Sequence, residues 1–338
     1  MSLTIYDISK KADVSIATVS RVLNGSPKVK EATRKKVMDI IDEYGYTPNS
    51  SARAMGLKSM KTIGILCADS SDIFLAKAVY YLEQNLQAHG YESLLCCTGY
   101  NMDSKKNYAN LILSKKVDGL ILVGSNFIGS TEEENQYIID CSAKVPVMIL
   151  NASFRHDNVY CILCDDMNSM YRATSEMYDS GITDILYLYD VLSYSGKKKL
   201  DGYRMAMQSH HAPDYEDLIC KVPDDCKSIE AISDYVTEFA SKSRPFHGII
   251  AADDQLAIAA IKYAQKNGIS IPDDLSVLGY NNSILTHCCT PELTSIDSQL
   301  ETQTRSLVKT LLGVLAGQEM PQKTVFSGSL IKRSTTNF

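Results

Sequence analysis

The sequence contains no hydrophobic run long enough to cross a membrane. Its apolar runs stop at about 5–8 residues between polar breaks, whereas a membrane-spanning helix needs roughly 20. The N-terminal segment MSLTIYDISKKADVS also lacks the apolar stretch of a secretory signal peptide. Hydrophobic residues make up 45% and charged residues 22%, as in soluble globular proteins. We therefore expect a cytoplasmic protein.

The sequence also lacks the common motifs of catalytic sites. It contains no GxxxxGK[ST], GxSxG or HExxH string, and no GxGxxG after a predicted strand. The six histidines are scattered, and a surface loop explains His287 beside Cys288 better than a thiol site does. The CxxC pair formed by Cys161 and Cys164 lies in a predicted strand, where residues three apart point to opposite faces. We expect ten mostly buried, reduced cysteines, no metal, no cofactor and no enzymatic activity.

Charge is distributed unevenly along the 338 residues. The net charge is −6, but the first sixty residues hold ten Lys or Arg and six Asp or Glu, so they carry +4 and the remainder −10. A basic module on an acidic body is expected when only the first module contacts nucleic-acid phosphates. The length predicts two or three domains.

The first module contains three short helical patterns. Thr4 is an N-cap residue with an acid three positions on, and Ser15 caps a second pattern, SIATVSRVLNG. A third pattern runs from about Lys30 to Tyr44 and stops at Gly45. Two helices joined by a turn of three or four residues describe a helix-turn-helix. A generic three-helix bundle with a solvated basic face is the alternative.

In a helix-turn-helix, the second helix enters the major groove with its N-terminal residues at the base edges. Here Ile16 and Ala17 are placed to meet thymine methyl groups, and Arg21 to pair with guanine. Other polar residues of the module are candidates for phosphate contacts, which position a protein without reading sequence: Thr4, Tyr6, Ser15, Thr18, Asn24, Lys30, Thr33 and Arg34.

Beyond residue 61, short apolar runs alternate with amphipathic stretches. Runs that are apolar throughout predict strands covered on both faces, and their spacing of about 25–30 residues suits βαβ units with right-handed crossovers. The pattern occurs twice, over about 62–160 and 161–290. The predicted fold class is therefore α/β, with an all-α module followed by two doubly wound parallel-sheet lobes. The predicted strands are 62–68, 92–98, 118–124, 146–152, 159–165, 184–190, 247–253 and 275–280.

The string TIYDISKKADVSIATVSRVLNG resembles the N-terminal signature of the lactose-repressor (LacI/GalR) family. The following VKEATRKKVMDIIDEYGYTPNSSARAM resembles that family's third helix and hinge, and the resemblance continues to the C-terminus. One departure is Asp13, where the family usually has glycine in the turn; aspartate tolerates a left-handed conformation better than most residues. The resemblance implies a transcriptional repressor, associated with the bacterial nucleoid, that binds a pseudo-palindromic operator as a homodimer under the control of an effector.

The resemblance also implies the domain plan. A helix-turn-helix domain would span residues 1–48, a hinge helix 49–60, and a type I periplasmic-binding-protein-like core 61–338. The N-lobe would comprise about 61–160 and 292–324 and the C-lobe about 161–291 and 325–338, with chain crossings near 161, 292 and 324. In the hinge, Arg53 would meet the phosphates or the minor groove, and Met55 takes the place of a leucine wedge. A solute-binding protein with the same core is the alternative from another class, and the basic module argues against it.

The effector cleft of the family lies between the lobes, at the carboxyl ends of strands. Several of its polar anchors are changed here: Lys199 stands for an arginine, Asn281 for an aspartate and Ser298 for a glutamine. Because lysine is a point charge and not a bidentate fork, we expect a ligand other than a simple sugar bound in the usual way, or none. The full set of cleft positions is Asp72, Ile73, Phe74, Asn126, Asn151, Lys199, Asp253, Asn281 and Ser298.

Within the family, the strings SDIF, KKKLDGYRMAM and ATVSRVLNGSPKV are most similar to the catabolite control protein A branch. Members of that branch take a serine-phosphorylated HPr phosphocarrier as corepressor. The resemblance carries over one basic contact, Lys309, but the second basic position is Gly313 and a Tyr-Asp pair is replaced by Glu301 and Thr302. One lysine near a new glutamate is a weak phosphate site. The effector therefore stays open between a small molecule and a phosphoprotein.

Overall fold

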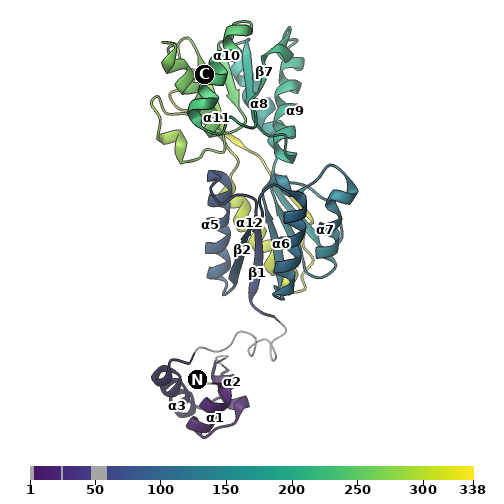
Figure 1. Cartoon of the computed structure of the whole chain (residues 1–338), viewed down its shortest axis with the longest axis vertical. Coiled ribbons are helices and arrows are strands. Elements are labelled where there is room, and N and C mark those ends of the chain that lie inside the picture. Colours follow the sequence, from purple (N-terminus) through teal and green to yellow (C-terminus); the bar gives the residue numbers. More distant parts are fainter. Residues whose placement is uncertain (1–3, 24–25, 47–58) are drawn as a thin grey trace. The chain divides into compact units, whose positions relative to one another are not determined.

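The computed structural model describes residues 4–23, 26–46 and 59–338. The chain divides into two compact units, Met1–Lys61 and Thr62–Phe338 (Figure 1). Three of the predicted DNA-contacting residues, Asn24, Arg53 and Met55, lie outside the described residues. Among the described helices, none combines the length and the apolar character that a membrane span requires.

The N-terminal unit contains the three predicted helices, α1 (Ile5–Ala12), α2 (Ile16–Leu23) and α3 (Glu31–Tyr44). The backbone N–H of Thr4 donates to Asp7 Oδ2 at 2.9 Å, and Ser15 Oγ accepts from the backbone N–H of Thr18 at 3.2 Å. These bonds satisfy polar groups at the starts of α1 and α2. Asp13 ends α1 in the left-handed conformation, with φ 50° and ψ 49°, so the turn forms without glycine. The small core of this unit consists of Ile8, Ala12, Val19, Val22, Val37 and Ile41.

The first lobe of the core is a six-stranded parallel sheet in the order β11-β5-β4-β3-β1-β2. Residues alternate along its strands between two apolar clusters, as in a sheet covered on both faces: Ile121 packs with α5 and α12, and Leu122 with α6 and α7. The strands are β1 (Thr62–Cys67), β2 (Glu92–Cys97), β3 (Gly119–Val123), β4 (Val147–Leu150), β5 (Val159–Cys164) and β11 (Lys323–Phe326). The helices are α5 (Ile73–Ala88), α6 (Met102–Ser114), η1 (Ser125–Phe127), α7 (Glu132–Ser142) and α12 (Leu300–Leu315).

The second lobe repeats this plan in the order β12-β10-β9-β8-β6-β7, with β12 antiparallel to β10. The repetition of the sheet order confirms the prediction of two similar lobes. Its strands are β6 (Ile185–Tyr189), β7 (Ile219–Lys221), β8 (Gly248–Ala251), β9 (Ser276–Tyr280), β10 (Thr294–Asp297) and β12 (Ser329–Ile331). Its helices are α8 (Asp166–Asp179), α9 (Tyr194–Ser209), η2 (Tyr215–Leu218), α10 (Ile229–Lys242), α11 (Asp254–Lys266) and η3 (Ile284–His287).

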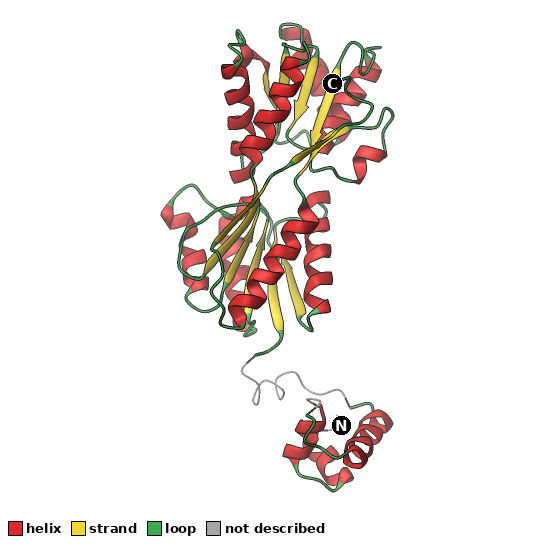
Figure 2. Ribbon diagram, turned by 180° about the vertical axis from the view of Figure 1, so that it is seen from behind, coloured by secondary structure: helices red, strands yellow, loops and turns green. Residues whose placement is uncertain are grey.

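The chain passes between the lobes three times, a few residues later than the resemblance implied (Figure 2). The crossings follow Cys164 and Asp297, and the third lies between Phe326 and Ser329, whereas they were expected near 161, 292 and 324. The shift arises because the strands stay paired in their own sheets until these points: Cys164 is still in register with Phe326, and β10 is parallel to β9 in the second sheet.

All ten cysteines are free, and the two of the CxxC pair point to different surroundings. Cys161 Sγ lies 3.4 Å from the carbonyl oxygen of Phe154, while Cys164 Sγ lies 3.8 Å from the hydroxyl of Tyr280. Five cysteines are buried, but Cys97 and Cys288 are exposed, so burial does not apply to every one of them.

Candidate DNA-reading surface and interlobe cleft

One face of α2 is free for contact with other molecules. Val19 and Val22 are buried beneath the helix, whereas Ile16, Ala17 and Arg21 are exposed on its other side. Ile16 is 40% exposed, so part of its apolar side chain is accessible to a binding partner. Arg21 forms no ion pair with any residue that the structure describes. The residues predicted to read bases therefore share one solvent-facing surface.

Four of the candidate phosphate contacts already have partners within the unit. The hydroxyl of Thr4 donates to Asp7 Oδ2 at 2.7 Å, so it helps to hold the start of α1. Arg34 Nη2 donates to the carbonyl oxygen of Ser26 at 2.6 Å and fixes the segment before α3. The side chains of Ser15 and Thr18 bond one another at 2.9 Å. The remaining described candidates are Tyr6, which is 62% exposed, Lys30, which is exposed, and Thr33, which is half-buried.

A cavity of about 190 Å³ lies between the two lobes of the core. The first lobe contributes four of the predicted cleft residues and the second lobe three. Most of them follow the carboxyl ends of strands, the edge at which open α/β sheets bind ligands. Those that line the cavity are Asp72, Phe74, Asn126, Asn151, Lys199, Asp253 and Asn281.

The other two predicted cleft residues lie elsewhere. Ile73 lines a larger groove of about 790 Å³ that runs along α5, residues 281–284 and the start of α12, and that shares Phe74 and Asn281 with the cavity. Ser298 is buried just after β10 and lines neither space, and its hydroxyl has no partner among the described residues. Both positions came from alignment to the family, which fixes their place in the chain but not where a shorter side chain reaches.

Turns with unusual backbone conformations bring two asparagines into the cleft. Asn151 follows β4 with φ 67°, and Asn281 follows β9 with φ 97°. Asparagine occupies this left-handed region more readily than most residues with a side chain. The two lobes also touch directly across the cleft, because Ser125 Oγ donates to Ser193 Oγ at 2.8 Å.

Behind the cavity, the second lobe holds a buried polar network that the sequence did not predict. Asp166 is 4% exposed and accepts hydrogen bonds from Tyr280 Oη at 2.6 Å and Ser195 Oγ at 2.5 Å. Burial raises the pKa of Asp166, and the positive charge of Lys199 opposes that rise. Lys199 Nζ donates to the carbonyl oxygen of Ala252 at 2.7 Å and lies 3.8 Å from the centre of the Tyr280 ring. The lysine is therefore held on several sides.

Two aspartates of the cleft cap helices and have raised pKa values. Asp253 Oδ1 accepts from the backbone N–H of Leu256 at 2.8 Å, and burial, together with the charge of Asp190, raises its pKa to about 7. Asp72 Oδ1 accepts from the backbone N–H of Leu75 at 2.8 Å. Desolvation raises the pKa of Asp72, and the charges of Asp69 and Asp190 add to the effect. Because Asp190 belongs to the second lobe and Asp72 to the first, carboxylates repel one another across the cleft.

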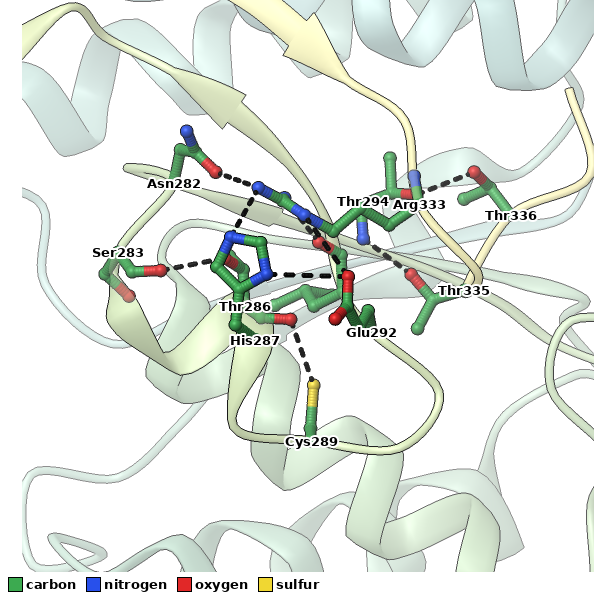
Figure 3. Close-up of polar contacts among 11 residues, drawn as sticks. Asn282, Ser283, Thr286, His287, Cys289, Glu292, Thr294, Arg333, Thr335 and Thr336 are labelled. Carbon is green, nitrogen blue, oxygen red and sulfur yellow. Dashed lines mark hydrogen bonds and ion pairs between the residues drawn. The ribbon is translucent and has the colours of Figure 1, made fainter.

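The loop that carries Asn281 is anchored by a partly buried arginine near the C-terminus (Figure 3). Arg333 Nη2 donates to Asn282 Oδ1 at 2.7 Å, and Nη1 donates to the carbonyl oxygen of Leu293 at 2.9 Å. His287 lies in the same cluster, 3.3 Å from Arg333 and 3.4 Å from Glu292. These contacts give His287 a structural setting, in line with the surface-loop interpretation.

Lys309, the predicted phosphoprotein contact, lines a groove of about 570 Å³ on the outside of α12. Arg305, one turn earlier, lines the same groove and was not predicted. Its guanidinium is already paired with Glu301 Oε1 at 2.8 Å. Gly313, which stands where a second basic residue was expected, also lines the groove.

Comparison with known proteins gives consistent matches over the whole chain. Residues 4–49 match the bacterial regulatory proteins of the lacI family, and residues 174–336 match a periplasmic binding protein-like domain. An HTH-type transcriptional regulator of Lachnoclostridium phytofermentans is 48% identical over 99% of this chain and 100% of its own. Catabolite control protein A of Priestia megaterium is 31% identical over 88% of this chain and 87% of its own. A solved structure of the lac repressor dimer bound to operator and an anti-inducer has a TM-score of 0.88, with 22% identity and 99% of each chain covered.

A helix-turn-helix unit joined to a two-lobed core with a cleft defines a class, the DNA-binding transcriptional regulators with an effector-binding core. The matches place the chain in this class and argue against a free-standing solute-binding protein. The chain belongs to the lacI family of bacterial regulatory proteins.

Proposed function

We propose that this regulator acts as a repressor, and that a ligand bound in the interlobe cleft sets its affinity for a pseudo-palindromic operator. The observation that carries the proposal is the pairing of an exposed reading face, Ile16, Ala17 and Arg21, with a cavity lined by both lobes. A ligand that contacts both lobes binds the closed arrangement better than the open one, so it shifts the population between them. We expect a coupling of about 1–3 kcal/mol between ligand and DNA. We place this activity in the cytoplasm, on the bacterial nucleoid.

We propose a homodimer because two reading helices are needed for two half-sites, and because the lac repressor neighbour is described as a dimer on its operator. The groove beside α5 supports a self-association face: Tyr80 and Ile284, which are 53% and 66% exposed, both line it. Ile284→Lys should lower the dimer fraction in analytical ultracentrifugation, with the exposed Leu111→Lys as control. A dimer insensitive to Ile284→Lys would place the contact on another face.

The hinge is part of the proposal although its residues lie outside the described ranges. We propose that Arg53 meets the phosphates or the minor groove and that Met55 wedges between base pairs. Met55→Gly should then remove operator bending while leaving the reading face intact. An unchanged bend angle in a circular-permutation gel assay would show that the wedge lies elsewhere.

The main test compares the full chain with a chain lacking residues 1–60. The full chain should prefer a palindromic duplex selected from a random pool, and the truncated chain should lose all binding in a gel shift while keeping the thermal transition of the core. Arg21→Glu in the full chain is the matched point variant. Specific binding that survives either change would overturn the proposal.

A phosphoprotein is the second candidate effector, favoured by Lys309 and Arg305 in one groove. A serine-phosphorylated HPr should then raise operator affinity, and Lys309→Glu should abolish the effect while Lys323→Glu, on β11, should not. Because Arg305 is already paired with Glu301, we rank this candidate below a small molecule.

A further inference from the structure

The interlobe cavity has a chemistry that restricts what can bind in it. This inference rests on the proposal that the cavity holds the effector. Its volume of about 190 Å³ equals roughly six waters at 30 Å³ each, which is the size of a small organic molecule. The aromatic rings of Phe74 and Tyr100 line it together with the polar residues.

Carboxylates outnumber cations among the charged residues that line the cavity. Asp72 comes from the first lobe, and Asp190 and Asp253 come from the second. Lys199 is the single cation among the described residues that line the space. Three acidic groups, of which Asp253 has a pKa of about 7 and is therefore only partly ionised at neutral pH, outweigh one basic group. They give the cavity a negative potential, because charges in a narrow protein cleft are poorly screened by water.

Lys199 is not available to an anion. Its ammonium donates to the carbonyl oxygen of Ala252 at 2.7 Å, lies over the Tyr280 ring, and is near the buried Asp166. An anionic ligand would have to break these contacts and approach three carboxylates. The cavity therefore disfavours phosphorylated or carboxylated ligands.

Two further polar atoms, on residues that line the cavity but shielded from its open space, are acceptors without donors. Asn126 Oδ1 and Asn151 Oδ1 are both buried and have no hydrogen-bond partner among the described residues, and both residues line the cavity. Lys105 Nζ donates to the main-chain oxygen of Asn126 at 2.6 Å, so the residue is fixed in place while its side-chain oxygen stays unpaired. A buried acceptor left unpaired costs free energy, and a ligand that donates hydrogen bonds would recover it once the amide group turns toward the cavity.

We propose that the effector is a small organic cation, an ammonium compound with further N–H or O–H donors such as an amino sugar or a diamine, held between Asp72 of the first lobe and Asp190 and Asp253 of the second. Its positive charge replaces a repulsion between the lobes with an attraction of each lobe for the same group. Binding and lobe closure are thereby one event, which links the ligand to the conformation of the core.

The test is calorimetric titration of the full-length protein with matched probes. Glucosamine and putrescine are the cations, glucose and N-acetylglucosamine the neutral counterparts, and glucose 6-phosphate the anion. We expect at least one cation to bind ten times more tightly than its neutral counterpart, and added salt to weaken that binding. Asp190→Asn and Asp72→Asn should each reduce it at least tenfold, whereas Asp224→Asn, a C-lobe surface carboxylate that is 88% exposed, should not.

Each outcome bears on one of the two proposals separately. The cation proposal is overturned if no cation binds, if a neutral or anionic probe binds as tightly, or if Asp190→Asn leaves the affinity unchanged. A neutral ligand that binds in the cavity and changes operator affinity would overturn the ligand class but support cleft control. A cation that binds through Asp72 and Asp190 without changing operator affinity in a gel shift would support the ligand class and overturn cleft control.

Discussion

The DNA-reading surface and the interlobe cleft are built in opposite ways. The reading residues lie within one eight-residue helix, exposed, on a unit whose core has six buried residues. The cleft residues follow strands as distant as β1 and β9, and they rest on a large core and a buried polar network. The DNA-reading surface depends on one local helix being folded, whereas the interlobe cleft depends on the assembly of both lobes.

The largest expected effect tests whether the two units are stabilised separately. Ile8 is fully buried in the N-terminal unit, and Ile8→Ala should cost about 2–5 kcal/mol. A unit of this size has only a few kcal/mol of stability, so operator binding should fall more than tenfold while the thermal transition of the core stays unchanged. The matched change in the core is Leu82→Ala, at a fully buried position of α5, which should lower that transition in circular dichroism. Equal effects of both changes on one shared transition would contradict separate units.

The next effect concerns the cleft alone and depends on pH. The pKa of Asp253 is about 7 in the folded core, above its value in the unfolded chain, so the folded state keeps a proton that the unfolded state has lost. This difference lowers the stability of the wild type as pH rises from about 4 to 7. Asp253→Asn keeps a good N-cap residue and should stabilise the core at pH 8 by about 4 kcal/mol, but not at pH 4.

The measurement is the urea midpoint of variant and wild type across this pH range. Asp224→Asn, at an exposed position, serves as the control and should leave the curve unchanged. A constant difference between Asp253→Asn and the wild type at all pH values would show that burial does not raise the pKa of this carboxyl group.

A smaller effect is expected at the reading surface. Arg21→Ala should cost about 1–3 kcal/mol of operator affinity and relax base preference at one position in each half-site. Lys36→Ala, at another exposed cation of the unit, should weaken all duplexes equally or not at all. Selection from a random duplex pool measures the affinity and the base preference of both variants. A uniform loss with Arg21→Ala would make this arginine a phosphate contact.

The smallest effect lies in the turn of the helix-turn-helix. Asp13 has φ 50°, and Asp13→Gly removes the side chain that opposes this conformation. This change raises the free energy of unfolding. The greater conformational entropy of glycine in the unfolded chain partly offsets the gain, so the unit should be stabilised by less than about 1 kcal/mol. Thermal unfolding of the unit, monitored by amide hydrogen exchange, measures this change in stability. A loss of stability would mean that the carboxylate itself supports the turn.

The contrast between a surface on one helix and a cleft assembled from distant strands also explains which features the sequence predicted. The caps at Thr4 and Ser15 and the glycine stop at Gly45 are local signals, and α3 was predicted to within one residue of its observed start. The apolar strands were found for the same reason, but β7, β10, β11, β12 and the crossing points were not, because pairing between distant strands sets them. Asp166 and Arg333 were missed, since a single charged residue carries no pattern of its own until its distant partner, Tyr280 or Asn282, is placed beside it.

The triple passage of the chain between the lobes also has a consequence for how the protein is made. The first sheet is complete only when β11 joins β5, and the second only when β12 joins β10. Both late strands follow α12, so the first sheet cannot be completed until residues up to Phe326 have left the ribosome, and the second not until Ile331, whereas the N-terminal unit can fold early. In a nascent chain, the DNA-reading unit therefore folds well before the core that would bind an effector.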